Sequence, residues 1–548
     1  MNRRKFITQG TLAASAFFLP GCGRFSDAVK TIPGRIVGAS AAAGHRLRFG
    51  PLPEPTEEWN VEVAVLGGGI SGLAAARKLS QLGVSDLLLL ELESETGGNA
   101  RSGQNDVSAF PWGAHYLPLP NEESTEVTAL LEELGLITGR DASGRPIFDE
   151  FALCSDPMER LFINGSWQEG FIPHLDVSAG DRAQIDAFLA LMDHWRRARG
   201  SDRRRAFAIP VDLSSTDADI RALDQITMAQ FLAQRGWTAE ALRWYVDYCC
   251  RDDYGAGSDQ VSAWAGVHYF ASRDGQAANA SSSAVLTWPE GNGWLAKKLR
   301  EGIGAKVQPN ALVWKIEPHE NEVVINYLDL ARETSVRVHA RGVVCALPRF
   351  VAEHLFDSAV PTSPLSSSVT AIPPLTSALT YSPWMVANLT LDAIPGAPAS
   401  APAWDNVFQP SRSLGYVDAT HQNLAQRSLK TVLTYYQPLD DAPPARAREL
   451  ALARSHRDWT AQIVADLETV HPGIRKSITN LDVWLWGHAM IRPTPGFIWG
   501  QDRAALQAPR GRVWFAHSDM SGLSIFEEAY TRGVTAAEAA LKQVRSRT

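Results

Sequence analysis

The fold class is decided by the stretch Val63-Ala-Val-Leu-Gly-Gly-Gly-Ile-Ser-Gly-Leu-Ala-Ala-Ala-Arg77. Residues 61–66 are predicted to form a buried parallel strand, and the glycines that follow have the G-x-G-x-x-G spacing at the start of an apolar helix. The first glycine allows a tight turn, the second lets backbone approach a pyrophosphate, and the third lets the helix pack closely on the sheet, with its positive end toward the phosphates. The residues expected to contact a dinucleotide are Gly67, Gly69, Ile70, Ser71 and Gly72.

A second predicted strand, residues 87–90, ends at Glu91, which lies 19 residues after Gly72 (91 − 72). A carboxylate at this point can accept hydrogen bonds from the two hydroxyls of a ribose. The glycine motif alone is weak evidence, but here the strand, the helix, the second strand and the acid occur in register. This unit could serve either NAD or FAD.

The composition limits the classes of protein that remain. A chain of 548 residues is too long for one ordinary core, so two domains are expected. The formal net charge of −8 argues against a nucleic-acid partner, whose phosphates require a basic face, and it is compatible with a cationic substrate. The five cysteines include no C-x-x-C pair, and no metal site is expected.

The first 22 residues have the pattern of a targeting segment. Asn2-Arg3-Arg4-Lys5-Phe6-Ile7 is followed by the apolar residues 11–19, which is typical of a twin-arginine export signal. Leu19-Pro20-Gly21-Cys22 is similar to a bacterial lipobox, in which a lipidated Cys22 would give membrane association. A basic soluble tail is the alternative. We therefore expect export in the folded state to the periplasm, with residues 23–58 as an extended linker.

Two periodicities alternate along the rest of the chain. Residues 122–140 and 180–200 have helical apolar spacing. Residues 311–316, 323–327 and 343–348 are predicted to form a small antiparallel meander that returns to a buried strand.

A second glycine doublet follows the ribose-binding acid, in Gly97-Gly98-Asn99-Ala100-Arg101. Together with the first motif, it resembles the flavin-containing amine oxidoreductase superfamily, which includes monoamine and polyamine oxidases, bacterial spermidine dehydrogenases and carotenoid desaturases. The resemblance implies FAD, with the backbone of Gly97 and Gly98 along the pyrophosphate. Arg101 could add positive charge there, while Asn99 stands where the family usually has a basic residue.

Three further segments extend the resemblance: Trp112 to Tyr116, Trp288 to Ile316, and Val513 to Gly533. The resemblance assigns to FAD Gly113, Ala114 and His115 beside the isoalloxazine ring, Val313 at the adenine, Asp519 at the ribityl chain, and Ile525 and Phe526 at the pyrimidine carbonyl. His115 is open to two interpretations, a histidine bonded to backbone near the flavin edge or a proton-handling residue.

The chain departs from the family pattern in three places. No lysine occurs from Arg349 to Ser428, where amine oxidases of this group usually carry one that holds water near flavin N5. Ile525 replaces one aromatic wall of the family's amine-aligning cage. Residues 486–490 include no cysteine, so the resemblance implies noncovalent FAD.

Other residues could rebuild a substrate site. Tyr436 and Trp486 join His115 as catalytic candidates, because aromatic faces attract cations, although they also pack against polyenes. Asp252 and Asp253 could bind the distal ammonium of a polyamine, or could lie at the surface.

The expected fold is a mixed α/β flavoprotein of two interleaved domains: a Rossmann-like FAD-binding domain from residues 59–118, 285–348 and 505–548, and a substrate domain from residues 119–284 and 349–504. The resemblance implies oxidation of a small amine or polyamine by hydride transfer to flavin N5, with a separate electron acceptor as an option. Two alternatives stay open, a desaturase or isomerase of an apolar lipid or polyene, and an electron-transfer module without a substrate of its own.

Overall fold

The computed structural model describes residues 31–48, 52–303, 306–356, 379–395, 403–424 and 428–546. The expected export signal and Cys22 lie outside this part of the chain. No helix in the described part is long and apolar enough to cross a membrane.

The glycine-rich loop joins β2 (Glu57–Leu66) to α2 (Ile70–Gln81) inside a seven-stranded sheet, as expected from the sequence. Its strand order is β12-β3-β2-β15-β14-β13, with β21 paired to β15. The other strands are β3 (Leu87–Leu90), β12 (Lys306–Gln308), β13 (Ala311–Pro318), β14 (Val323–Asp329), β15 (Thr334–Cys345) and β21 (Val513–Phe515). The predicted meander is confirmed, because β13, β14 and β15 pair antiparallel and β15 then pairs parallel with β2.

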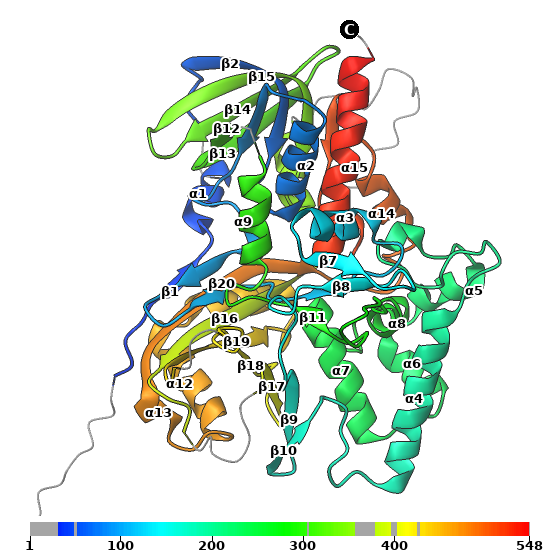
Figure 1. Ribbon diagram of the computed structural model, residues 1–548. Helices are drawn as coiled ribbons and strands as arrows, with labels where there is room; N and C mark the ends of the chain where they lie inside the picture. Colours follow the sequence, from blue (N-terminus) through cyan, green and yellow to red (C-terminus); the bar gives the residue numbers. More distant parts are fainter. Residues whose placement is uncertain are drawn as a thin grey trace, which may run out of the picture. The chain divides into compact units, whose positions relative to one another are not determined.

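Helix α15 (Phe526–Arg545) packs beside α2, as Figure 1 shows for the red and blue helices. The contact is close because Gly533 faces Ala74, and a Cβ at Gly533 would come within 2.8 Å of the Ala74 Cβ. Helix α3 (Thr125–Glu133) also packs on α15 and buries Val127 and Leu130 in this core. The sequence placed the end of this stretch of the nucleotide-binding unit at residue 118. Helix α3 lies after that boundary but shares the core of the unit, because its apolar face is covered by α15.

A second, eight-stranded sheet has the order β1-β20-β16-β19-β18-β17-β9-β10. Its strands are β1 (Ile36–Gly38), β9 (Glu159–Ile163), β10 (Ser166–Glu169), β16 (Tyr381–Leu391), β17 (Asp405–Phe408), β18 (Tyr416–Asp418), β19 (Thr431–Pro438) and β20 (Ile478–Ile491). The predicted linker differs from the structure here, because residues 36–38 pair parallel with β20 and Ile32 is buried. Backbone hydrogen bonds to a sheet edge hold this segment in place.

Helices α4 (Ala179–Arg197), α7 (Glu240–Tyr254) and α8 (Ala263–Ala271) pack together in a helical layer, while α12 (His456–Glu468) packs on β20 (Figure 1). The remaining helices are α1 (Ala41–His45), α5 (Ala218–Arg221), α6 (Met228–Gln234), α9 (Gly293–Glu301), α10 (Arg349–Ala352), α11 (Pro444–Ala453), α13 (Ile474–Ser477) and α14 (Gln501–Leu506). The remaining strands are short: β4 (Ser102–Gln104), β5 (Ala109–Pro111), β6 (Leu117–Pro118), β7 (Ile137–Arg140), β8 (Pro146–Phe148) and β11 (Val285–Leu286).

Candidate active site

The two glycine-rich loops meet at their backbones. The N–H of Gly97 donates to the carbonyl of Gly68 at 2.8 Å. A Cβ at Gly98 would lie 3.1 Å from the Cα of Gly69, and Gly98 has φ +55°, a left-handed conformation that glycine adopts without strain. The helix N-terminus of α2 begins directly beside them at Ile70. This bare backbone surface suits the close approach of a pyrophosphate.

Glu91 lies at the end of β3, as expected for a ribose-binding acid. Its two carboxylate oxygens accept the backbone N–H groups of Gly68 at 2.6 Å and Glu93 at 2.8 Å. The side chain is 8% exposed, and burial raises its pKa. The N–H of Ala311 donates to the carbonyl of Glu91 at 2.8 Å, so the strand that carries Val313 begins beside this acid. Each oxygen keeps a lone pair for a ribose hydroxyl.

Arg101 is used differently from the expectation that it adds free positive charge at the pyrophosphate. Its Nη1 forms an ion pair with Glu93 at 3.2 Å, and its guanidinium lies 5.2 Å from the ring centre of Trp484. Asn99, in the position that is usually basic, donates to the carbonyl of Ala489 at 2.6 Å. The charge of Arg101 is therefore partly neutralised by Glu93.

Asp519 is 1% exposed and has one oxygen without a hydrogen-bond donor. Its Oδ2 accepts the N–H of Arg349 at 2.9 Å and the hydroxyl of Tyr381 at 2.6 Å. His517 Nδ1 lies 3.1 Å from Oδ1 and also 3.1 Å from the backbone nitrogen of Asp519. A buried carboxylate oxygen without a donor is costly. A hydroxyl of a ribityl chain would satisfy it.

A cavity enclosing about 1010 Å³, part of it open to solvent, brings four separated stretches of the chain together. The candidates from the sequence that line it are Asn99, Gly113, Ala114, His115, Asp252, Asp253, Tyr436, Trp486, Ile525 and Phe526. The lining also includes residues that sequence reasoning missed, among them Tyr116, Tyr248, Arg273, Trp384, Asp405 and Glu527. The sequence feature that could have pointed to Asp405 is an acid inside the strand-like run Trp404-Asp-Asn-Val-Phe408.

His115 is a neutral aromatic wall of this cavity. Its ring stacks on Tyr436 with centres 4.6 Å apart, and its Nδ1 lies 3.4 Å from the carbonyl of Gly113. Burial lowers its pKa to about 4. The imidazole is therefore uncharged near pH 7, which matches the interpretation of a histidine held by backbone better than that of a proton carrier.

The polar atoms of Tyr436 and Trp486 also form hydrogen bonds to backbone carbonyls. The Tyr436 hydroxyl donates to the carbonyl of Gly113 at 3.1 Å, and Trp486 Nε1 donates to the carbonyl of Trp112 at 2.6 Å. Burial raises the pKa of Tyr436 well above its usual range. Both residues therefore present aromatic surface to the cavity and have no acid–base function at neutral pH.

Acidic side chains outnumber basic ones in the cavity. Asp253 pairs with Arg273, which is the sole lysine or arginine in the lining among the described residues. Asp252, Asp405 and Glu527 form no ion pair with any described residue. Burial raises the pKa of Asp252 and of Glu527 to about 7, and that of Asp405 well above its usual range. The cavity thus combines excess acid with aromatic walls, a surface suited to a cation.

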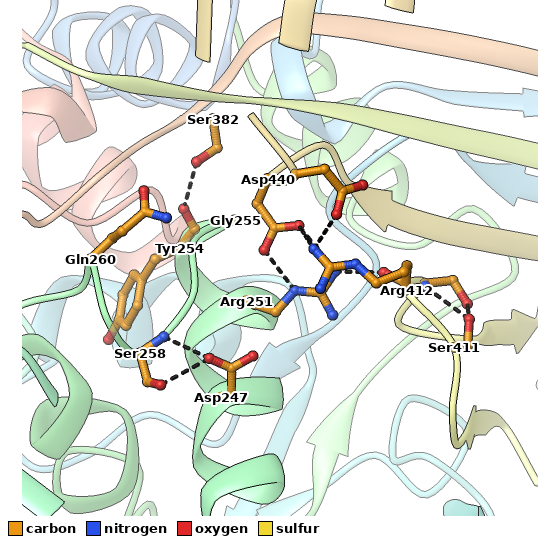
Figure 2. Close-up of polar contacts among 12 residues, drawn as sticks. Asp247, Arg251, Tyr254, Gly255, Ser258, Gln260, Ser382, Ser411, Arg412 and Asp440 are labelled. Carbon is orange, nitrogen blue, oxygen red and sulfur yellow. Dashed lines mark hydrogen bonds and ion pairs between the residues drawn. The ribbon is translucent and has the colours of Figure 1, made fainter. Parts of the chain in front are cut away.

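The end of α7, which carries both aspartates of the cavity, is anchored by the network in Figure 2. Arg251 donates from Nε to Asp440 Oδ2 at 2.8 Å and from Nη2 to the carbonyl of Arg412 at 2.5 Å. Ser382 donates to the carbonyl of Tyr254 at 3.0 Å. These bonds join the last turn of α7 to β16 and to the segment after β19. No group of three His, Cys, Asp or Glu side chains in the described part could hold a metal ion.

Residues 65–134 match the family of NAD(P)-binding Rossmann-like domains. The Mycobacterium tuberculosis protein AofH, whose name describes it as a flavin-containing monoamine oxidase, is 26% identical over 275 residues, which are 49% of this chain and 54% of that protein. The chain thus spans about half the length of these curated relatives. Mitochondrial protoporphyrinogen oxidase of Nicotiana tabacum is 40% identical over 74 residues, 14% of each chain.

Solved structures match over more of the chain. Wild-type putrescine oxidase bound to putrescine has a TM-score of 0.65 at 16% identity, over 88% of this chain and 100% of that chain. Cyclohexylamine oxidase from Brevibacterium oxydans has a TM-score of 0.60 at 17% identity, over 88% and 99%. The CLA-producing fatty acid isomerase from P. acnes also has a TM-score of 0.60, at 15% identity, over 87% and 98%. The chain therefore has the fold of the amine-oxidase-like flavoproteins.

Proposed function

We propose that this protein is a FAD-dependent oxidoreductase that oxidises a small amine or polyamine. The observation that carries the proposal is the cavity itself, in which Asp252, Asp405 and Glu527 face aromatic walls without a cation of their own. An ammonium group can leave water where carboxylates and aromatic faces replace its hydration shell. A polyene or a lipid chain gains nothing from buried carboxylates, so the desaturase or isomerase alternative fits this cavity less well.

The described residues fit FAD in two places. The paired glycine loops and the α2 N-terminus suit its pyrophosphate, and the free oxygen of Asp519 suits its ribityl hydroxyls. FAD, when bound, would accept a hydride from the carbon next to the amine nitrogen. His115, Tyr436 and Trp486 would orient that carbon by packing, since all three are neutral and held by backbone.

The test is reduction of the flavin under anaerobic conditions. The purified holoprotein is mixed with n-butylamine, benzylamine, putrescine or spermidine, and its visible spectrum is recorded. We expect bleaching of the flavin band by at least one of these amines. An unchanged spectrum across the panel, together with bleaching or product formation with linoleic acid, would replace the amine by an apolar substrate.

We further propose that FAD is held noncovalently, that a separate electron acceptor reoxidises it, and that the protein is exported to the periplasm with Cys22 as a lipid anchor. Acid precipitation should release the flavin into the supernatant. Cell fractionation should recover the wild-type chain outside the cytoplasm and the Arg3→Lys/Arg4→Lys double variant inside it. A Cys22→Ser variant that stays in the membrane fraction would contradict the anchor.

A further inference from the structure

Two acids are neighbours in the second sheet because of strand register. β17 pairs parallel with β9, and Asp405 is the direct partner of Glu159. Side chains of paired residues point to the same face of a sheet. The next pair in the register is Asn406 and Arg160, whose side chains point to the opposite face of the sheet. There Arg160 Nε donates to Asn406 Oδ1 at 2.5 Å. Arg160 is therefore turned away from the two acids.

Asp252, on α7, and Asp405 both line the cavity, whereas Glu159 is not among the lining residues. Burial raises the pKa of Asp252 and of Asp405, and repulsion from Glu159 adds to both shifts. None of the three forms an ion pair with a described residue. Like charges opposite each other destabilise a sheet, so the arrangement carries a cost in stability. Such costs are typical of functional sites.

Two further polar side chains line the cavity. Tyr248 is 5% exposed, and Glu527 is 3% exposed and pairs with no described lysine or arginine. A cationic ligand would give Glu527 a partner, together with the acids that line the cavity.

We propose that Asp252, Asp405 and Glu159 form a proton-accepting carboxyl trio that converts the bound ammonium of the substrate into the neutral amine. The inference rests on the proposed amine oxidation. In the step, one N–H bond of the ammonium breaks, an O–H bond forms on the trio, and the freed electron pair stays on nitrogen. A neutral amine is needed because an ammonium nitrogen has no lone pair with which to form the imine.

The environment of the trio suits this transfer. Burial raises the pKa of Asp252 and that of Glu159 to about 7, and repulsion from Asp253 and Glu159 adds to the shift at Asp252. The pKa of an alkylammonium is about 10.4, so a carboxyl with a pKa of about 7 accepts its proton roughly 10³-fold more readily than an ordinary aspartate. Arg273 is the cation that faces the trio, and Asp253 is paired with it. Glu527 lines the same cavity, and burial raises its pKa to about 7. The tyrosines and cysteines around the trio are neutral at pH 7, and burial raises their pKa values further: Tyr116, Tyr245, Tyr248, Tyr269, Tyr416, Tyr436, Cys154 and Cys249.

The experiment compares Asp405→Asn and Glu159→Gln with the wild-type holoprotein, using the amine of the panel that bleaches the flavin fastest. Glu169→Gln is the matched control, because this exposed glutamate lies on the neighbouring strand β10. The rate of anaerobic flavin reduction at saturating amine is followed from pH 6 to pH 10. We expect a roughly 10²- to 10⁴-fold loss at pH 7 that shrinks to a few-fold at pH 10, where solvent supplies the neutral amine. The control should follow the wild type at every pH.

Equal losses at pH 7 and pH 10, or unchanged profiles, would overturn the inference. An increase in KM for putrescine and spermidine at all pH values, without a lower rate at saturation, would also overturn it, because that pattern identifies a binding site for a second ammonium. Each variant removes a like charge, so its melting temperature should not fall, and its flavin spectrum reports folding. If no amine bleaches the wild-type flavin, the proposed function itself is wrong. Bleaching with unaltered variant profiles refutes the trio alone.

Discussion

The anchor of α7 predicts a measurable loss of stability and of substrate affinity in Arg251→Met. The arginine side chain is 8% exposed and that of its partner Asp440 is 6% exposed. Three hydrogen bonds leave Arg251, at 2.8 and 3.2 Å to the Asp440 carboxylate and at 2.5 Å to the carbonyl of Arg412. Removing one partner of a buried pair costs about 3–5 kcal/mol, because the other charge is left in a poorly solvated place.

The lower end of that range applies here. Arg412 Nη2 lies 3.3 Å from Asp440 Oδ1 and would keep part of the carboxylate compensated. A loss of about 3 kcal/mol, at roughly 2.1 cal/mol/K of unfolding entropy per residue, corresponds to about 3 °C of Tm for a chain of about 500 residues. The same change loosens the turn that carries Asp252, so KM for the amine should rise more than kcat falls.

The assay is calorimetric melting beside anaerobic kinetics. Arg412→Met serves as the control, because its side chain is 61% exposed and an exposed pair contributes ~0–1 kcal/mol. The double variant Arg251→Met/Asp440→Leu should regain most of the lost Tm, since an apolar pair replaces a buried ion pair at little cost. Equal shifts for Arg251→Met and Arg412→Met, or no recovery in the double variant, would refute the reasoning.

Three further predictions concern the cavity and the residues expected to hold FAD. Burial raises the pKa of Glu527 in the folded state from 4.5 to about 7, so the stability that its neutral form provides is complete below pH 4.5 and is lost as the pH rises through 7. The Glu527→Gln variant should therefore be more stable than the wild type by up to about 3 kcal/mol at pH 8 and by far less at pH 5. Melting curves at both pH values measure this difference, and Glu169→Gln should not show it. Gly98→Val should lower the ratio of flavin to protein absorbance roughly tenfold or more, because its side chain would approach the backbone of Gly69. Gly135→Val is the control: its φ is +72°, but a Cβ there would meet nothing within 4 Å, so the ratio should not change. Asp519→Ala should weaken FAD binding by about 10- to 100-fold in a titration of the apoprotein, and an unchanged Kd would mean that its free oxygen does not meet the cofactor.

The nucleotide-binding unit was predictable from the sequence because its signals are local. A buried strand, three glycines and an apolar helix are adjacent in the chain, and they became β2 and α2. The meander was predictable for the same reason, since successive antiparallel strands need only short turns. Glu91 and Asp519 also lie where the motifs around them placed them, each at the end of a strand or just beyond it.

The cavity depended on contacts between distant residues, which no local pattern encodes. Asp405 and Glu159 are 246 positions apart (405 − 159) and meet through the register of two short strands. The neutral state of His115 follows from its burial against Tyr436, although its ordinary pKa would leave it open to a proton-handling role. Residues 36–38 joined a sheet edge that the chain completes more than 400 residues later.

The sequence by itself determined the Rossmann-like unit and the position of Glu91 at the end of its second strand, because short-range hydrophobic periodicity and glycine geometry suffice for both. Only the tertiary structure decided which side chains face one another across the cavity and which of them keep their charge. Register and burial set those properties, and both arise when the second sheet and α7 pack together. The acid-rich cavity is therefore a property of the folded chain.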